Sequence, residues 1–115
     1  MLVKVLKSKI HRATVTGVDP EYEGSITIDP ILMEAARLLA HESVHVWNIR
    51  TGDRLETYVL PGKRDSGEVR LNGAAARRAG PGDLVIIAAF AWAEGSEAER
   101  ACPAIVKVDD RNRIA

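Results

Sequence analysis

The stretch SVHVWNIRTGDRLETYVL, from Ser43 to Leu60, decides the fold class. In its first half, Val44, Val46 and Asn48 alternate with the residues between them, which is the pattern of a strand with one buried face. TGDR has the composition of a hairpin turn, and LETYVL predicts the returning strand. An antiparallel hairpin in the middle of the chain predicts a protein built mainly from β-sheet.

Short strand patterns also occur on both sides of this hairpin. We expect them over residues 3–7, 12–18, 25–28, 68–71, 84–93 and 104–109. Many short strands joined by sharp turns are typical of a small closed β-barrel. A barrel of 115 residues has no room for a deep pocket of its own, which favours a site at a subunit interface.

Two helical segments are expected. The longer is PILMEAARLLAHE, residues 30–42, where Asp29 can cap the first turn and Pro30 suits the first helical position. Its buried face would hold Ile31, Ala35, Leu38 and Leu39. The second segment is NGAAARRAG, residues 72–80, which predicts one or two turns capped by Asn72.

Composition excludes several classes of protein. The 16 basic and 16 acidic residues give a net charge of zero, which argues against binding nucleic acid through a positive field. Cys102 is the single cysteine, so the chain cannot form an internal disulfide or a cysteine-based zinc site. His41 and His45 have no carboxylate cluster beside them to complete a metal site. We expect a cytoplasmic protein without a metal or a membrane span.

The Gly24-Ser25 pair could carry chemistry. Glycine allows unusual backbone geometry, and a neighbouring serine hydroxyl can attack the preceding carbonyl and turn the amide into an ester. Elimination then leaves dehydroalanine, which hydrolyses to a pyruvoyl group at residue 25. Most Gly-Ser pairs are only turns, so this pair alone does not decide between the two interpretations.

Four longer pieces bear on that choice: KSKIHRATVT (7–16), YEGSITID (22–29), VHVWNIRTGDRLETY (44–58) and NGAAARRAGPGDLVIIAAF (72–90). Together they resemble the bacterial L-aspartate alpha-decarboxylase family, whose members make β-alanine for pantothenate and coenzyme A. The pieces occur in the family's order and cover most of residues 1–90, whereas the resemblance fades beyond Gly95. Ile26 stands where members of the family often have cysteine, which leaves the chemistry of the neighbouring hydroxyl unchanged.

The resemblance implies a six-stranded double-psi β-barrel that assembles as a homotetramer with its sites between subunits. It implies self-cleavage into residues 1–24 and 25–115, with or without a helper protein. The pyruvoyl group made from Ser25 would form a Schiff base with aspartate and accept electrons as CO2 leaves. No pyridoxal phosphate and no metal are needed for this reaction.

The resemblance also assigns roles to side chains. Tyr58 would donate the proton to the product, because a phenol keeps its proton at neutral pH. Arg54 and Lys9 would bind carboxylate, and Thr57 would serve cleavage and lie near the substrate. The remaining substrate contacts would come from Asn72, Gly73, Ala74 and Ala75. His11, Tyr22 and Trp47 also match positions of the family, although Tyr22 and Trp47 could be core residues and His11 a hydrogen-bonded strand residue.

The spacing in the returning strand carries a further expectation. Arg54 and Tyr58 are four residues apart and so share one face of an ideal strand, whereas Thr57 points to the other face. If all three serve one site, the strand has a bulge or the site draws on two subunits. Two other interpretations stay open: a barrel that only binds a partner or small ligand, and a pyruvoyl enzyme for a different acidic amino acid.

Overall fold

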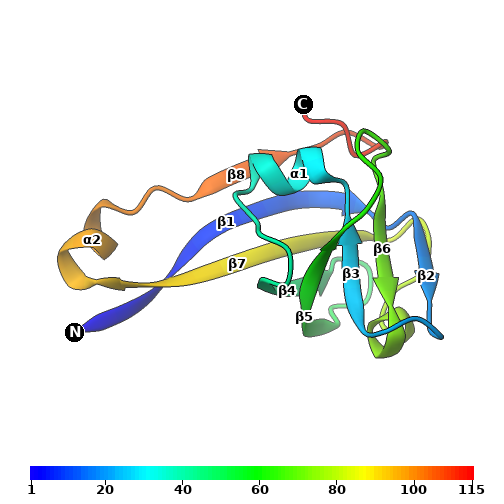
Figure 1. Ribbon diagram of the computed structural model, residues 1–115, viewed down its shortest axis with the longest axis horizontal. Coiled ribbons are helices and arrows are strands. Elements are labelled where there is room, and N and C mark those ends of the chain that lie inside the picture. Colours follow the sequence, from blue (N-terminus) through cyan, green and yellow to red (C-terminus); the bar gives the residue numbers. More distant parts are fainter.

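The computed structural model describes residues 1–115, and β-strands dominate it (Figure 1). The strands are β1 Leu2–Thr14, β2 Gly17–Asp19, β3 Ser25–Ile28, β4 Ser43–Asn48, β5 Arg54–Pro61, β6 Val69–Asn72, β7 Leu84–Glu94 and β8 Ala104–Lys107. The helices are α1 Pro30–Ala35, the 3-10 helix η1 Gly73–Arg77 and α2 Gly95–Arg100. The expected mainly β class is confirmed.

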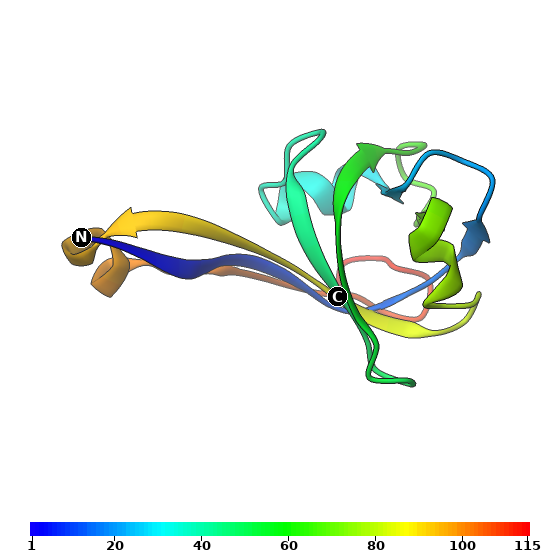
Figure 2. The same cartoon turned by 90° about the horizontal axis from the view of Figure 1, so that it is seen from below.

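The strands are hydrogen-bonded in the order β2-β6-β3-β5-β4-β7-β1-β8. β4 and β5 form the expected antiparallel hairpin, from Ser43 opposite Tyr58 to Trp47 opposite Arg54. The strands curl round on one another, as Figure 2 shows, and they enclose an apolar core. Fully buried core side chains include Ile10, Ile26, Val46, Val59, Leu71 and Ile87. β3 lies between β6 and β5, which places Ser25 in the middle of a three-strand group.

β1 and β7 extend away from the curled strands as a long arm that ends in α2 (Figure 1). They pair from Leu2 opposite Glu94 to Thr14 opposite Leu84, and the molecule measures 42 × 28 × 25 Å as a result. Trp92 on this arm is 66% exposed. The arm therefore presents apolar surface that the chain itself does not cover.

The prediction of a separate strand over residues 12–18 is wrong. Residues 12–14 continue β1 past a register shift between Ile10 and Ala13, and only residues 17–19 form a new strand, β2. Arg12 lies in this irregularity with a positive φ of 62°. A bulge with an extra residue bends a strand without ending it, and no glycine marks the position in the sequence.

The helix expected over residues 30–42 ends at Ala35, although its start is as predicted. Asp29 caps the first turn by accepting a hydrogen bond from the Ile31 amide at 2.9 Å. The end is a Schellman motif, in which the Leu38 amide bonds the Met33 carbonyl and Arg37 adopts a φ of 57°. Arginine occupies the left-handed position where glycine is usual, so the sequence lacks the stop signal. Leu39, expected on the buried face, is 73% exposed.

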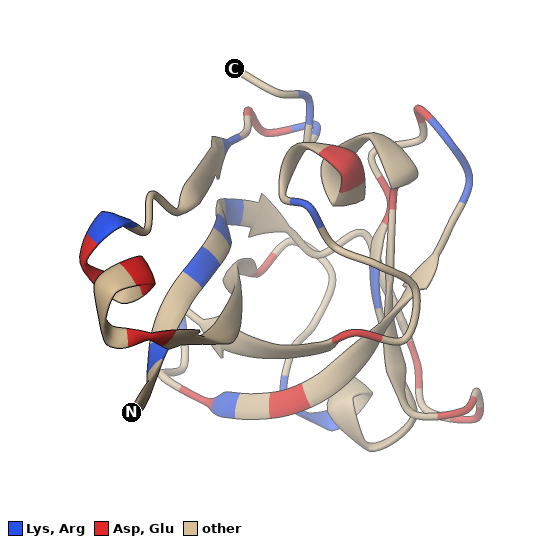
Figure 3. Cartoon of the chain, turned by 60° about the vertical axis from the view of Figure 1, so that its left-hand side comes forward, with Lys and Arg blue, Asp and Glu red and all other residues tan.

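Figure 3 shows basic and acidic residues in several parts of the chain, including β5 and α2, each of which carries both signs. One ion pair, between Lys7 and Glu42 at 2.7 Å, is mostly buried. None of the helices has the length and apolar character that crossing a membrane requires.

Asp83 connects the β4–β5 hairpin to the segment after η1. Its carboxylate accepts hydrogen bonds from Arg50 Nε at 2.7 Å, Asn48 Nδ2 at 3.0 Å and the Gly80 amide at 2.9 Å. These donors, with Arg50 contributing most, hold the pKa of the Asp83 carboxyl well below its usual range. The network fixes two segments that border the cavity described below.

Replacing Asp83 by asparagine should lower the free energy of unfolding by about 1–2 kcal/mol at pH 7, because the charged acceptor is lost. A depressed pKa stabilises the folded state above the pKa of an unfolded aspartate, about 4, and this contribution is lost as the pH falls further. Thermal unfolding of wild type and variant should therefore differ at pH 7 and converge below about pH 4. Asp110→Asn, at an exposed position, is the control. Equal stability at pH 7 would contradict the prediction.

Candidate active site

Three residues predicted for the site lie on neighbouring strands, and two of them are paired. Ser25 on β3 pairs directly with Asn72 on β6. On the other side, β3 runs parallel to β5, and this pairing begins with Ile26 opposite Val59, so Ser25 and Tyr58 are the residues that precede the first pair. Neighbouring strands are about 4.8 Å apart, and paired residues share a face. The fold thus brings together residues that are far apart in the sequence.

The Ser25 side chain is fully buried and hydrogen-bonded on two sides. Its hydroxyl donates to the Glu23 carbonyl at 3.0 Å and accepts from Asn72 Nδ2 at 2.9 Å. These bonds fix the hydroxyl next to the Gly24-Ser25 peptide. They also correct the expectation that Asn72 caps the following helix, because its side chain makes no cap hydrogen bond to η1 and instead lies over the sheet.

Gly73 packs directly against Gly24. The backbone of Gly73 has a φ of 65°, and a Cβ atom there would lie 2.6 Å from Gly24 Cα and 2.7 Å from Gly24 N. Gly24 itself is outside the left-handed region. The conformational freedom of glycine is therefore used at residue 73, where the start of η1 approaches the segment before Ser25.

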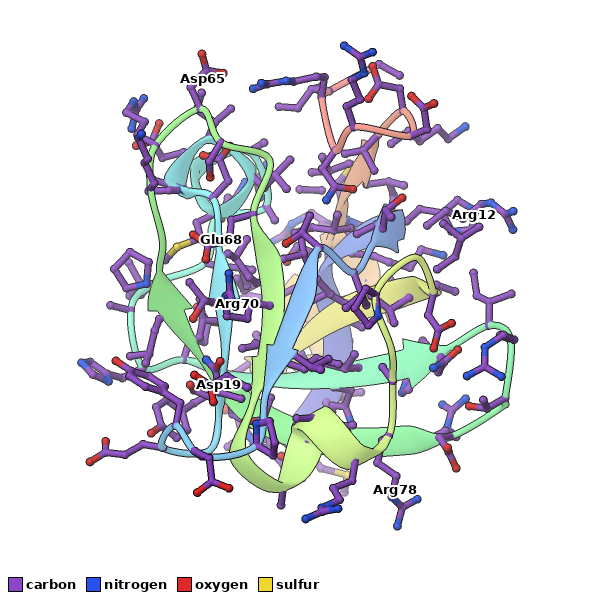
Figure 4. The ribbon with its side chains drawn as sticks, turned by 90° about the vertical axis from the view of Figure 1, so that its right-hand side faces the viewer. Arg12, Asp19, Asp65, Glu68, Arg70 and Arg78 are labelled. Atoms are coloured by element: carbon purple, nitrogen blue, oxygen red, sulfur yellow. The ribbon has the colours of Figure 1, made fainter.

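A cavity of about 480 Å³ opens beside these residues. Its lining includes Gly24, Arg54, Thr57, Tyr58, Ala74 and Ala75, all of which were predicted site residues. Leu55, Glu56 and Arg78 complete it and were not predicted. Arg78 follows η1 (Figure 4) and reaches the cavity through the fold of that segment, which leaves no signal in the sequence.

Of the two alternatives considered for β5, a bulge or a contribution from two subunits, the bulge is absent. The pairing of β4 with β5 is regular from Arg54 to Tyr58, yet Arg54, Thr57 and Tyr58 all line the cavity. The reason lies at the other edge of β5, which pairs with β3 only from Val59 onward. The cavity runs along this free edge, so side chains from both faces of the strand reach it.

Two aromatic contacts position the cavity's side chains. The guanidinium of Arg54 lies 4.2 Å from the centre of the Trp47 ring, a cation–π stack that holds an otherwise exposed arginine. The Tyr58 ring stacks on His41, with centroids 6.2 Å apart and planes 29° apart. The Arg54 guanidinium and the Tyr58 phenol are therefore each held by an aromatic ring that is not part of the cavity lining.

Lys9 does not reach this cavity within one chain. It pairs with Ala88 on β7, and Ala88 pairs with His45, which pairs with Glu56 on β5. Three strand intervals, about 14 Å, separate Lys9 from β5. The structure thus brings together every predicted site residue except this lysine.

The other residues that match the family lie around the edges. His11 faces a different hollow, which Arg12 and Lys107 also line. Its Nδ1 is buried without a hydrogen-bond partner, and burial lowers the pKa of the ring, so it is not the hydrogen-bonded strand histidine considered above. Tyr22 is 54% exposed, which excludes a place in the core.

Comparison with known proteins decides the family. A sequence model of the family described as aspartate decarboxylase matches residues 1–115. The chain belongs to the aspartate decarboxylase family. The match includes residues beyond Gly95, where the motif resemblance faded, so the α2 and β8 segment also belongs to the family domain.

Individual members of the family are similar over nearly the whole chain. The aspartate 1-decarboxylase of Lactiplantibacillus plantarum is 55% identical over 99% of this chain and 88% of its own length. That of Syntrophus aciditrophicus is 56% identical over 96% of this chain and 95% of its own. That of Clostridium beijerinckii is 54% identical over 99% of this chain and 92% of its own.

Proposed function

We propose that the chain decarboxylates L-aspartate to β-alanine and CO2, as a pyruvoyl enzyme that cuts itself between Gly24 and Ser25. The observation that carries this proposal is the buried Ser25 hydroxyl, hydrogen-bonded by Asn72, next to a cavity lined by Gly24, Tyr58 and Arg54. The names of the relatives, aspartate 1-decarboxylase, support the reaction and the substrate. β-Alanine supply for pantothenate follows from the product, and a lone exposed thiol at Cys102 suits a cytoplasmic enzyme.

Cleavage begins at the Ser25 hydroxyl. Its oxygen bonds to the Gly24 carbonyl carbon, the Gly24-Ser25 amide bond breaks, and the freed nitrogen takes the proton. Elimination removes the Cα proton of residue 25, breaks the Cβ–O bond of the resulting ester and releases residues 1–24 with a carboxylate, which leaves dehydroalanine at residue 25. The imine form of this residue adds water and loses ammonia. Residues 25–115 then begin with a ketone. The buried, doubly hydrogen-bonded hydroxyl supports this course, because it is held next to the bond that it attacks.

The surroundings of Ser25 fit a pyruvoyl group, since the small residues Gly24 and Ala74 border the cavity and Asn72 offers a donor. The group supplies an electron-accepting carbonyl for decarboxylation. Arg54, held by Trp47, binds a substrate carboxylate, and Asn72 with the Gly73-Ala74-Ala75 turn bounds the substrate. Thr57 assists cleavage from the cavity wall.

Tyr58 donates the proton that the product needs at Cα. The presence of Tyr58 in the lining of the cavity that Gly24 also borders supports this role. No metal site takes part in this scheme. The charge that develops is handled by hydrogen-bond donors and by the pyruvoyl carbonyl.

We further propose a closed double-psi barrel that assembles as a homotetramer with its sites between subunits. The position of Lys9, about 14 Å from β5, supports this, because a neighbouring subunit could bring its own Lys9 to the cavity. The exposed apolar arm, with Trp92 and Leu2, offers surface for such contacts. Whether a helper protein speeds cleavage does not alter the residues involved.

The decisive experiment is an intact mass of the purified protein under denaturing conditions, followed by an assay for β-alanine from aspartate. We expect two fragments that split between Gly24 and Ser25, with a pyruvoyl group on the larger. An uncut chain, still uncut after long warm incubation, would favour a barrel that only binds. A cut chain that prefers glutamate would keep the chemistry and replace the substrate.

Replacing Gly73 by alanine should slow cleavage by roughly tenfold or more, because strained backbone and a close contact each cost on the order of 1–3 kcal/mol. The new Cβ would meet Gly24 Cα and N, so the segment to be cut would have to move. The measurement is the fraction of cut chain over time by mass spectrometry. Gly80→Ala is the control, since a Cβ there meets nothing within 4 Å. Equal cleavage of the two variants would contradict the prediction.

A further inference from the structure

Thr27 makes an unassigned contact to the residue that holds Ser25. It lies on β3 two positions after Ser25, on the same face. Asn72 Nδ2 donates one hydrogen bond to Ser25 Oγ and another to Thr27 Oγ1, each 2.9 Å long. A single amide nitrogen therefore joins the two hydroxyls.

These two bonds are all that orient the Asn72 carboxamide. The residue is 1% exposed, and its Oδ1 is buried without a hydrogen-bond partner. An amide turned by 180° would place Oδ1 towards Ser25, and the serine proton could then leave the Glu23 carbonyl for Oδ1. Two acceptors side by side, at Ser25 and Thr27, suit both N–H groups at once and favour the observed orientation.

The two branches of Thr27 contact different neighbours. Its hydroxyl faces Asn72, whereas its methyl packs near Gly62, where an added Cβ would lie 2.8 Å from Thr27 Cγ2. The hollow over Thr27 and Asn72 contains the charged side chains of Asp19, Glu68 and Arg70 (Figure 4). Arg70 pairs with Glu68 at 3.2 Å, and none of the three bonds to the Thr27 hydroxyl.

We infer that Thr27 is a positioning residue for self-cleavage, which orients Asn72 and through it the Ser25 hydroxyl. This inference rests on the proposed function. Loss of the Thr27 hydroxyl leaves the Asn72 amide with one acceptor, so the serine oxygen spends less time where it can attack. One neutral hydrogen bond corresponds to a roughly three- to tenfold slower cleavage.

Two variants separate the hydroxyl from the methyl. Thr27→Val keeps the shape and removes the acceptor, whereas Thr27→Ser keeps the acceptor and removes the methyl beside Gly62. With cleavage of fresh precursor followed by intact mass, we expect the valine variant to be slow and the serine variant to be near wild type. A valine variant at the wild-type rate, or a serine variant as slow as the valine one, would overturn the inference. Thr27→Ala replaces Thr27→Val if the latter does not fold.

A second readout needs no cleavage and so separates this inference from the proposed function. The sequence contains three asparagines and no glutamine, so NMR of the full chain shows three side-chain amide groups. In a Ser25→Ala background, adding Thr27→Val should accelerate hydrogen exchange of the Asn72 amide by roughly tenfold or more, since it loses its last acceptor. Asn48 and Asn112 each keep two acceptors and serve as internal controls. Unchanged exchange at Asn72, or equal acceleration at all three, would overturn the inference, even for a wild type that never cuts itself.

Discussion

Ser25→Ala should give a folded chain of 115 residues that is neither cut nor able to form β-alanine from aspartate. In the proposed mechanism the hydroxyl attacks the Gly24 carbonyl and leaves with residues 1–24, and Ser25 itself becomes the pyruvoyl residue, so loss of the hydroxyl removes the whole reaction rather than part of it. The side chain is buried but small, and alanine fits the same space. Intact mass, circular dichroism and the aspartate assay on one preparation test all three parts of the prediction.

A suitable control for this variant is Ser96→Ala, at an exposed position in α2. It should be cut and active like the wild type. Normal fragments or residual turnover in the Ser25 variant would show that another residue makes the pyruvoyl group. Loss of folding is tested separately, because the circular dichroism of the two variants should be the same.

Tyr58→Phe should still be cut but should turn over aspartate on the order of 100-fold more slowly, the usual size of a general-acid effect. Phenylalanine keeps the ring that stacks on His41, so only the hydroxyl is lost. The fall should appear in kcat per cut chain, with KM little changed, because in our proposal Arg54 and not the phenol binds the carboxylate.

The variant to compare with Tyr58→Phe is Arg54→Lys. It should mainly raise KM, because lysine lacks the forked donors of arginine. The fraction of cut chain, measured by mass, normalises both values of kcat. An unchanged kcat in Tyr58→Phe would remove Tyr58 as the proton donor while leaving the pyruvoyl chemistry intact.

Features that depend on neighbouring residues could be predicted from the sequence. The β4–β5 hairpin follows from alternation and a turn, and the start of α1 follows from Asp29 and Pro30. The end of α1 could not be predicted, because Arg37 takes a left-handed conformation for which its residue type gives no sign. The bulge at Arg12 could not be predicted either, because arginine there also has a positive φ.

Some features of the site could likewise be predicted from the sequence, and others could not. Small residues around Gly73 and the spacing of Arg54 and Tyr58 are visible in the sequence, and the cavity contains them. Asn72 looked like a helix cap, because its real partners, Ser25 and Thr27, lie 47 and 45 residues away along the chain. Contacts at such separations come from strand order, which composition and periodicity do not encode.

The pairing of β1 has a consequence for a cut molecule. β1 and β2 lie before Gly24, yet their strand partners β7, β8 and β6 all lie after Ser25. The 24-residue piece therefore stays in place as part of the sheet once the peptide bond is gone. Renaturation of a cut molecule then requires two separate peptides to find each other, so its yield should depend on protein concentration, whereas an uncut chain refolds alone. If the chain matures by the proposed cut, refolding after heat or denaturant becomes a two-peptide assembly, which is slower in dilute solution than the refolding of one chain.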